Sequence, residues 1–334
     1  MKIVITGGCG FLGRRLAMLL LERGCASGPV DELVLFDNAA SALPLPADDR
    51  VRLVTGDIAD RDTVARLIAP HGTKSATAAV CHLAAIVSGQ AEADTDLGYR
   101  VNLDGTRAVL DACRALGGTP KLVFASSLAV YGGSLPPAVG EDTALTPQSS
   151  YGTQKAIGEL LVNDYTRKGF VDGRALRLPT VVVRPGLPNR AASTFASSMI
   201  REPLCGKDAV CPVAPETVMA LASPRRVVAA LAHALDLPGE ALGADRSLQV
   251  PGFSVSVGEM AEALRRAAGD AAYRRIAWQP DPAIQRIISS WPMALATPRA
   301  DRLGFERDSG IDEVVRFFIE DDLAMQQALV SAGR

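Results

Sequence analysis

The sequence has few of the residues that form metal centres or disulfide frameworks. Its only histidines are His71, His82 and His233, and they lie far apart in the chain. Its six cysteines include no CxxC pair and have irregular spacings. Such cysteines, in a long chain without a secretory signal, are typical of buried free thiols, so we expect no disulfide framework. We also expect no metal site, because a histidine-rich centre has too few ligands here.

Long apolar runs and an excess of one charge sign are also missing. No apolar run approaches the roughly 18 residues that a membrane span needs. The formal net charge is −2 and no basic stripe stands out, which argues against a nucleic-acid partner. After Met1-Lys2 the chain passes directly into a strand-like run, without the layout of a signal peptide. We therefore expect a cytoplasmic protein.

The composition is that of a globular protein with a large core. The 334 residues are 48% hydrophobic and 22% charged, as in ordinary soluble domains. A chain of this length needs no covalent cross-links to bury its core. It is long enough for two domains, or for one large domain with an appended lobe.

The first half of the chain alternates short apolar runs with longer amphipathic segments. The apolar runs predict strands at 2–6, 33–36, 51–55, 79–83, 121–125 and 173–178. Apolar residues at helical spacing predict helices at 11–23, 61–68, 96–116 and 149–168. Strands that alternate with helices form a parallel sheet covered on both faces. The sequence therefore predicts an α/β fold with a doubly wound parallel sheet.

The second half is less regular. Closely spaced prolines between positions 179 and 224 interrupt the alternation. Helices are expected at 224–235, 256–268, 283–289 and 311–328, and Ser256 with Glu259 makes a capping box. We predict a first domain at 1–180 and a smaller mixed lobe at 181–334, with some C-terminal segments returning to the sheet.

A glycine-rich loop joins the first strand to the first helix. Gly7, Gly10 and Gly13 have GxxGxxG spacing, and Phe11 and Leu12 begin the helix. Glycines let the backbone turn sharply and approach a pyrophosphate, and a helix N-terminus offers N–H groups and a partial positive charge. The alternative is a tight turn without a ligand. The strand before the loop and the helix after it favour a dinucleotide site.

Acidic residues after the second and third strands extend this prediction. Asp37, followed by Asn38, ends the second strand, near the position where a carboxylate binds the ribose diol of adenosine. A carboxylate there repels a 2′-phosphate, so NAD is favoured over NADP. Asp57 and Ile58 follow the third strand, where the carboxylate can meet the adenine edge. The alternative for Asp37 is an ordinary exposed loop residue.

A tyrosine and a lysine form the second strong motif. Tyr151 and Lys155 are four residues apart, so they share one face of a helix. A nearby ammonium group stabilises phenolate and makes the tyrosine a usable base at neutral pH. Ser127 follows a strand at the carboxyl edge of the sheet, where ligands bind. The alternative for Tyr151 and Lys155 is the face of an ordinary amphipathic helix. The glycine loop, Ser127 and the Tyr151–Lys155 pair follow one another along the chain in the order that such an active site requires, which favours a catalytic role.

These features together resemble the extended short-chain dehydrogenases/reductases, within the NAD-dependent epimerase/dehydratase family. The resemblance covers residues 1–186. The matched pieces are the glycine loop at 7–13, Asp37, Gly56-Asp57, His82-Leu83-Ala84-Ala85, the segment 101–106, Ser126-Ser127, Val130-Tyr131-Gly132 and the YxxxK motif at 151–155. The resemblance implies a Rossmann-type sheet, an NAD-dependent enzyme that acts on a CH–OH group, a C-terminal lobe that binds substrate, and a homodimer.

The resemblance also implies roles for single residues. Tyr151 is expected to be the acid/base, Lys155 to hold the nicotinamide ribose and tune Tyr151, and Ser127 to orient the substrate. The Ala84-Ala85 backbone is expected to line the cofactor, and Asn102 to support the site. The expected cofactor residues beyond the loops already named are Leu83, Ala84, Ala85, Asn102, Tyr151, Lys155, Leu178, Thr180 and Val181.

Other segments resemble, more narrowly, the sugar-acid dehydrogenases of this family: 86–100, 151–165, 177–186 and 195–204. This implies NAD-dependent oxidation of a four-carbon sugar acid at its 2-hydroxyl to the 2-keto acid. Ser88, Gly89, Arg184 and Arg190 are candidate substrate residues, because a carboxylate needs an arginine or N–H partner. Each arginine has an ordinary ion pair as its alternative. At Leu187 the sequence departs from the pattern, which has a basic residue there.

Two other functions stay open at this point. A nucleotide-sugar epimerase or dehydratase uses the same scaffold and needs a diphosphate pocket in the C-terminal lobe. The dehydratase needs an acidic residue just after the active-site serine, where this chain has Leu128 and Ala129. A sensor that binds a dinucleotide without catalysis has no need of Ser127, Tyr151 and Lys155 together, so we favour the dehydrogenase.

Overall fold

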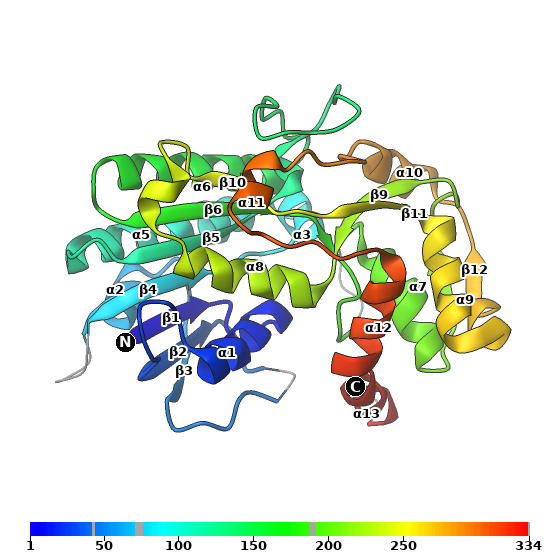
Figure 1. The fold of residues 1–334 in the computed structure, drawn as a ribbon, viewed down its shortest axis with the longest axis horizontal. Coiled ribbons are helices and arrows are strands. Elements are labelled where there is room, and N and C mark those ends of the chain that lie inside the picture. The colour runs from blue at the N-terminus through cyan, green and yellow to red at the C-terminus, as the bar shows by residue number, and fades with distance from the viewer. Residues whose placement is uncertain (42–43, 71–75, 188–190, 333–334) are drawn as a thin grey trace. The chain divides into compact units, whose positions relative to one another are not determined.

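Seven parallel strands form the central sheet of the fold (Figure 1). They run in the order β10-β6-β5-β4-β1-β2-β3. Their bounds are β1 Lys2–Thr6, β2 Glu32–Asp37, β3 Val51–Thr55, β4 Thr77–His82, β5 Lys121–Ser127, β6 Asp172–Leu178 and β10 Ser247–Gln249. β1 and β2 are almost entirely buried, as strands covered on both faces are. The predicted α/β class and parallel sheet are confirmed.

The computed structural model describes residues 1–41, 44–70, 76–187 and 191–332. The chain divides into two compact units. Unit 1 consists of Met1–Val130, Pro147–Leu178 and Val228–Gln249, and unit 2 of Tyr131–Thr146, Pro179–Val227 and Val250–Arg334. The whole seven-stranded sheet lies in unit 1. Its last strand, β10, comes late in the chain and pairs with β6.

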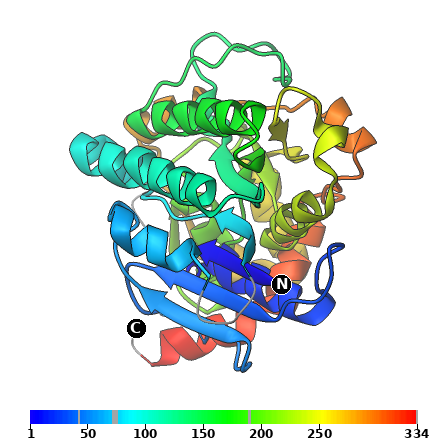
Figure 2. The same ribbon diagram turned by 90° about the vertical axis from the view of Figure 1, so that its left-hand side faces the viewer.

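Helices cover both faces of the sheet in unit 1. The helices are α1 Phe11–Arg23, α2 Arg61–Ile68, α3 Ser88–Ala93, α4 Thr95–Gly98, α5 Gly105–Leu116, α6 Ser150–Arg167 and α8 Pro224–Asp236, with 3₁₀ turns η2 Leu128–Val130 and η3 Gly239–Leu242. α2, α5 and α6 share one buried apolar cluster with the strands, built around Val34, Val80 and Phe124. α1 and α8 lie on the other side of the strands (Figure 2).

The strand order reverses beside β1. The chain runs from β1 to β2 and β3 on one side of β1, and continues with β4, β5 and β6 on the other. At such a switch point the loops after the two neighbouring strands lead to opposite faces, and ligands bind at the carboxyl ends of the strands there. The loops after β1 and β4 begin at this edge.

The predicted helix at 96–116 is wrong in one respect. The segment contains α4, then a π-helical stretch η1 at Tyr99–Asp104, then α5. A π-helical turn holds one more residue than an α-helical turn. The buried Asn102 lies in this stretch, and its side chain makes three hydrogen bonds to residues outside it.

Unit 2 contains two small sheets and six helices within its described residues. β11 Phe253–Ser256, β9 Val218–Ala222 and β7 Thr180–Val181 form a mixed sheet, and β8 Ala209–Cys211 pairs with β12 Ile276–Trp278. The helices are α7 Thr194–Leu204, α9 Val257–Tyr273, α10 Pro282–Ser289, α11 Pro298–Arg302, α12 Ile311–Asp321 and α13 Leu323–Ser331. An apolar cluster of its described residues, with Met199, Leu221, Met260 and Phe318, forms a core.

Of two predictions for unit 2, the cap of α9 is confirmed and the length of the last helix is wrong. Ser256 Oγ accepts the N–H of Glu259 at 3.1 Å and caps α9, as predicted. The predicted helix at 311–328 is wrong, because Asp322 leaves the helical region at φ −128° and separates α12 from α13. Aspartate is a poor residue for a helix interior and a good one for a helix end. Across the described ranges, no helix has the length and apolar content of a bilayer span.

Candidate active site

The glycine loop forms a cradle at the carboxyl end of β1. Gly7 has φ +71°, and a Cβ atom on it would lie 2.8 Å from Ala84 N. A Cβ atom on Gly13 would lie 2.3 Å from Gly7 O. Since real Cβ atoms do not approach so closely, both positions need glycine. The backbone of the loop is therefore packed directly against the start of α1.

The N-terminus of α1 opens onto this cradle. Gly10 is the N-cap and no side chain caps the helix. The N–H groups of Phe11 and Leu12 have no acceptor within the helix, because the N–H groups in the first turn of any helix have no carbonyl partner in the preceding turn. These N–H groups and the helix dipole suit an anion, and a pyrophosphate has both the charge and the acceptor oxygens. The loop therefore fits the phosphates of a dinucleotide.

Asp37 is held in place at the end of β2. Its Oδ2 accepts the N–H of Cys9 at 3.0 Å, and its Oδ1 accepts the N–H of Asn38 at 2.8 Å. The structure thus brings the predicted ribose carboxylate against the glycine loop. An acidic group fixed beside the loop suits a ribose diol and repels a 2′-phosphate.

Asp57 lies at the end of β3 and already has partners. Its carboxylate accepts the N–H of Ala59 at 2.9 Å and a hydrogen bond from the Arg100 guanidinium. These two contacts, in that order, lower the pKa of Asp57. Ile58 is buried against Gly105, where a Cβ atom would lie 2.9 Å from Ile58 Cγ2. The ion pair holds η1 to the loop after β3.

A directional chain of hydrogen bonds supports the segment after β4. Ala84 N–H donates to Thr6 Oγ1 at 3.3 Å, and Thr6 Oγ1 lies 2.6 Å from His82 Nδ1. On the other side, His82 Nε2 lies 3.0 Å from Thr106 Oγ1, which donates to Asn102 O at 2.6 Å. Because the Thr106 proton is used on Asn102, the His82 proton must be on Nε2. Burial, with a smaller contribution from Lys155, lowers the pKa of His82 to about 3, so the ring is neutral.

Asn102 fixes the same segment from the helix side. Its Oδ1 accepts the N–H of Ile86 at 2.9 Å, and its Nδ2 donates to Ile86 O at 3.2 Å. Its Nδ2 also donates to Gln154 Oε1 at 2.8 Å. Leu83 N–H donates to Thr6 O at 3.0 Å and continues the ladder past β4. Residues 83–86, which include Ala84 and Ala85, are thus anchored at both ends.

Tyr151 and Lys155 lie on one face of α6, as predicted. Lys155 Nζ lies 5.6 Å from the centroid of the Tyr151 ring. It donates to Ala125 O at 2.7 Å and lies 4.7 Å from the Phe124 ring centroid. Burial lowers the pKa of Lys155 to about 8, and the Glu159 carboxylate opposes this shift. The side chain therefore places a buried ammonium group beside the phenol.

The start of α6 is pressed against the chain that follows β5. Ser149 Oγ accepts the N–H of Gly152 at 3.1 Å and caps the helix. A Cβ atom on Gly152 would lie 2.0 Å from Ala129 O. Ser127, two residues before Ala129, accepts its N–H at 3.1 Å. The helix start that carries Tyr151 and the segment that carries Ser127 are therefore brought together by a glycine that the sequence analysis did not single out.

Glu159 and its partners are further residues near the site that were not among those predicted from the sequence. The Glu159 carboxylate accepts Arg177 Nε at 3.0 Å and Arg177 Nη2 at 2.8 Å. It also accepts Ser126 Oγ–H at 2.5 Å. Glu159 is four residues after Lys155, so the spacing that pairs Tyr151 with Lys155 was a signal for it. Nothing local marks Arg177 as its partner.

The remaining predicted residues are divided between the two units. In unit 1, Ser88 and Gly89 begin α3, and Leu178 ends β6 opposite Ser127 in the ladder. In unit 2, Thr180 and Val181 form β7.

Arg184, also in unit 2, donates from its N–H to Ser197 Oγ at 3.0 Å and from its guanidinium to Ser193 Oγ at 3.2 Å. Leu187 is 64% exposed. Arg190 lies outside the described residues.

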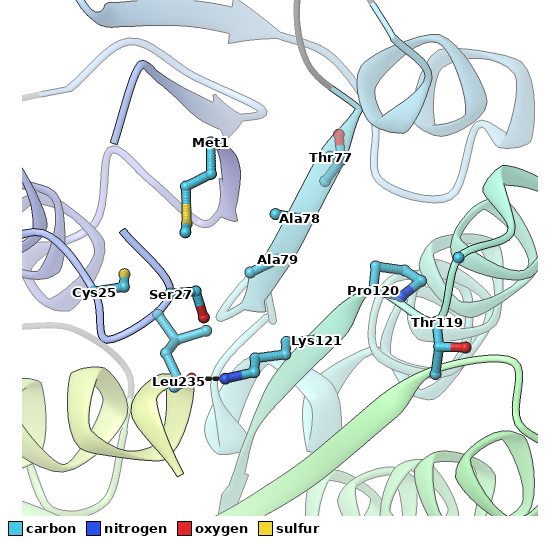
Figure 3. Close-up of a pocket in the computed structure, with 11 residues that line it drawn as sticks. Met1, Cys25, Ser27, Thr77, Ala78, Ala79, Thr119, Pro120, Lys121 and Leu235 are labelled. Atoms are coloured by element: carbon cyan, nitrogen blue, oxygen red, sulfur yellow. Dashed lines mark hydrogen bonds between the residues drawn. The ribbon is translucent and has the colours of Figure 1, made fainter. Parts of the chain in front are cut away.

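A hollow of about 230 Å³ lies at the opposite edge of the sheet (Figure 3). It is lined where β1, β4 and β5 begin, by residues that include Met1, Thr77 and Lys121. Lys121 Nζ is already bonded to Leu235 O at 2.6 Å. The hollow is smaller than the roughly 300–1,000 Å³ of a typical ligand pocket. The glycine loop and residues 83–85 follow the other ends of β1 and β4.

A doubly wound parallel sheet with a glycine cradle at its switch point defines a dinucleotide-binding protein of the Rossmann class. The profile of the NAD dependent epimerase/dehydratase family matches residues 3–236. The chain belongs to this family, and NAD is its cofactor.

Individual relatives match over nearly their whole length. The chain is 54% identical to the D-erythronate dehydrogenase of Cupriavidus necator, over 96% of this chain and 98% of that one. It is 46% identical to the D-erythronate dehydrogenase of Haemophilus influenzae, over 97% and 100%. Among solved structures, the nucleoside-diphosphate-sugar epimerase from Agrobacterium tumefaciens matches with a TM-score of 0.90 and 41% identity, over 98% and 96%.

Proposed function

We propose that the protein is an NAD-dependent dehydrogenase that oxidises D-erythronate at its C2 hydroxyl to the 2-keto acid. The observation that carries this proposal is the Tyr151–Lys155 face of α6, with a buried ammonium group beside a phenol. The two relatives named D-erythronate dehydrogenase support the choice of substrate.

Most of the proposed cofactor contacts are backbone groups and carboxylates of unit 1, and Thr180 and Val181 belong to unit 2. In this proposal Gly7, Gly10, Phe11, Leu12 and Gly13 hold the pyrophosphate, since their backbone forms the cradle. Asp37 and Asn38 bind the adenosine ribose, and Asp57 and Ile58 border the adenine. The other proposed contacts are Leu83, Ala84, Ala85, Asn102, Leu178, Thr180 and Val181. Bound NAD supplies the acceptor for the hydride that leaves the substrate carbon.

The catalytic residues act on the substrate hydroxyl. Tyr151 removes its proton, because the nearby Lys155 ammonium stabilises the phenolate. Ser127 donates a hydrogen bond to the substrate oxygen and orients it. Two fixed groups thus share the charge that develops on that oxygen. Lys155 holds the nicotinamide ribose as well.

The carboxylate of the acid needs its own partners. Ser88 and Gly89 at the start of α3 are proposed to bind substrate oxygens, and Arg184 and Arg190 are proposed for the carboxylate. The Arg184 guanidinium has a serine hydroxyl as a neighbour and is positively charged at any physiological pH.

A nucleotide-sugar epimerase is the second candidate. The observation that favours it is the similarity to the Agrobacterium structure of that name. Leu128 and Ala129 follow Ser127, so the acidic residue that a dehydratase needs is missing from this position. The dehydrogenase accounts for the identity to both D-erythronate dehydrogenases, so it stays first.

We also propose a homodimer that works in the cytoplasm. α5 and α6 lie side by side in both views (Figures 1 and 2). Leu160 on α6 is 65% exposed, so an apolar side chain is available to a second copy with the same face. All six cysteines are free thiols, which suits a reducing compartment. Analytical ultracentrifugation tests the dimer, and a single monomer peak contradicts it.

The test is NADH formation with purified protein. NAD or NADP is supplied with aldonic acids of several chain lengths, and with UDP-sugars in parallel. We expect NADH with D-erythronate and NAD, and its loss in Tyr151→Phe. D-erythronate deuterated at C2 should pass deuterium to the cofactor, whereas the isomer deuterated at C3 should not. Turnover of a UDP-sugar, with no acid oxidised, contradicts the proposal and favours the epimerase.

A further inference from the structure

Three charged groups near the candidate catalytic tyrosine are almost fully buried. Lys155, Glu159 and Arg177 are 3%, 1% and 4% exposed. Charges that water does not screen interact far more strongly than surface charges do. The group contains two cations and one anion, so the Glu159 carboxylate is the counter-charge within it for both neighbours.

Glu159 opposes the effect of burial on Lys155. Burial lowers the pKa of Lys155 to about 8, and the Glu159 carboxylate is the group that raises it. Of the other described groups near Lys155, His82 on β4 is neutral and Tyr151 on the same helix face is uncharged before it ionises. Arg177 on β6 is paired with Glu159. β5 contributes the Ala125 carbonyl. Without Glu159, the ammonium group loses its nearest counter-charge.

The surroundings of Glu159 also fix where its charge lies. Ser126 and Arg177 are directly opposite each other in the β5–β6 ladder, so they point to the same face of the sheet. Both bind the carboxylate, and Arg177 does so through two nitrogens. Because these partners hold the carboxylate, it attracts Lys155 without drawing Nζ away from Ala125 O.

We propose that Glu159 is a positioning residue of this enzyme, which keeps the Lys155 ammonium charged on Ala125 O and so keeps Tyr151 able to release its proton. The part that concerns catalysis rests on the proposed dehydrogenase function. The effect on the phenol does not, since it is a property of the folded chain alone.

The test is a titration of Tyr151 in the protein without substrate or cofactor. Each protein is compared with its own Tyr151→Phe variant, so that the difference in tyrosinate ultraviolet absorbance reports this one phenol. Glu159→Gln removes the charge and keeps the shape of the side chain. Loss of the carboxylate lowers the titration midpoint of the phenol by its direct effect, and raises it through Lys155, because the ammonium group then loses its proton at lower pH. Lys155 is the nearer charge to the phenol, so we expect a net rise of about one pH unit in the midpoint of Tyr151.

Two variants serve as controls. Ser126→Ala removes a hydrogen bond of the same carboxylate and leaves its charge, so the midpoint should stay near that of the parent protein. Glu159→Asp keeps the charge, so its Tyr151 midpoint should lie closer to that of the parent protein than to that of Glu159→Gln. An unchanged midpoint in Glu159→Gln, or an equal rise in Ser126→Ala, overturns the proposal.

A double variant covers the case in which Glu159→Gln does not fold because Arg177 is left unpaired. Glu159→Gln with Arg177→Gln removes both charges of this pair. Because loss of the Arg177 cation acts on Lys155 in the opposite sense, the reference for the double variant is Arg177→Gln alone, and its Tyr151 midpoint should be higher than that of the reference. Equal midpoints in these two proteins refute the proposal.

Activity gives a separate reading. The acid limb of kcat/KM for D-erythronate should move to higher pH by the same amount in Glu159→Gln. If the phenol titration shifts as expected while the parent protein oxidises no sugar acid, the proposed function fails and the electrostatic role of Glu159 stands.

Discussion

Lys155 is a charged side chain whose burial opposes folding, so replacing it should change how stability depends on pH. The fold lowers the pKa of Lys155 from 10.5 to about 8. At about 1.36 kcal/mol per unit, this shift corresponds to roughly 3 kcal/mol. The unfolded chain holds the proton more tightly than the folded chain does. Below the folded pKa the whole penalty is present, and above the unfolded pKa it is gone.

Lys155→Met removes this dependence on pH. The unfolding free energy of the lysine protein, minus that of the variant, should rise by about 2 kcal/mol between about pH 7 and about pH 10. The variant also loses the hydrogen bond from Nζ to Ala125 O, which costs about 1–3 kcal/mol. That loss offsets the gain from removing the charge at neutral pH but does not vary with pH. The slope with pH is therefore the measured quantity.

The assay is urea unfolding followed by far-ultraviolet circular dichroism. Both proteins carry Tyr151→Phe, so that the phenol does not contribute to the slope. Tryptophan fluorescence is unsuitable, because Trp278 and Trp291 both lie in unit 2 while Lys155 lies in unit 1. Lys168→Met, at the exposed end of the same helix, is the matched surface control against which the slope for Lys155 is compared. A flat or falling difference for Lys155 refutes the reasoning.

Three further predictions concern the backbone and the cofactor. Gly13→Ala should weaken NAD binding at least 10-fold, because the added Cβ meets Gly7 O at 2.3 Å, and calorimetry measures this change of about 1.4 kcal/mol. Asp37→Ser should lower the ratio of kcat/KM for NAD over NADP by about 10-fold or more, since the repulsion of a 2′-phosphate is lost; an unchanged ratio contradicts the role. Gly152→Ala, whose Cβ meets Ala129 O at 2.0 Å, should reduce kcat by about 100-fold, as small displacements of catalytic groups do, with NAD affinity retained; full activity would show that this contact does not position α6.

Local sequence patterns were sufficient to predict the strands of the central sheet. The six predicted strands of the first half all occur, because nearly continuous apolar runs between turns are typical of buried parallel strands. The glycine loop and the shared face of Tyr151 and Lys155 follow from spacing along a single element. The helical spacing of apolar residues also predicted α12, but it did not predict that this helix ends at Asp322. The end depends on a single aspartate, and the spacing of the apolar residues does not show it.

The sequence by itself determined the class of fold, the cofactor loop and the Tyr151–Lys155 pair, because each depends on residues close together in the chain. Only the tertiary structure decided which carboxylate and which guanidinium form the buried ion pair near Lys155, namely those of Glu159 and Arg177. Glu159 and Arg177 lie on different elements, and only the packing of α6 on β6 brings them together. It also decided the proton position on His82 and the partners of Asn102 in the π-helical turn, since these hydrogen bonds join distant segments. Such contacts produce no periodic pattern in the sequence. Their partners are brought together by the packing of separate helices and strands, and not by the spacing of residues along a single element.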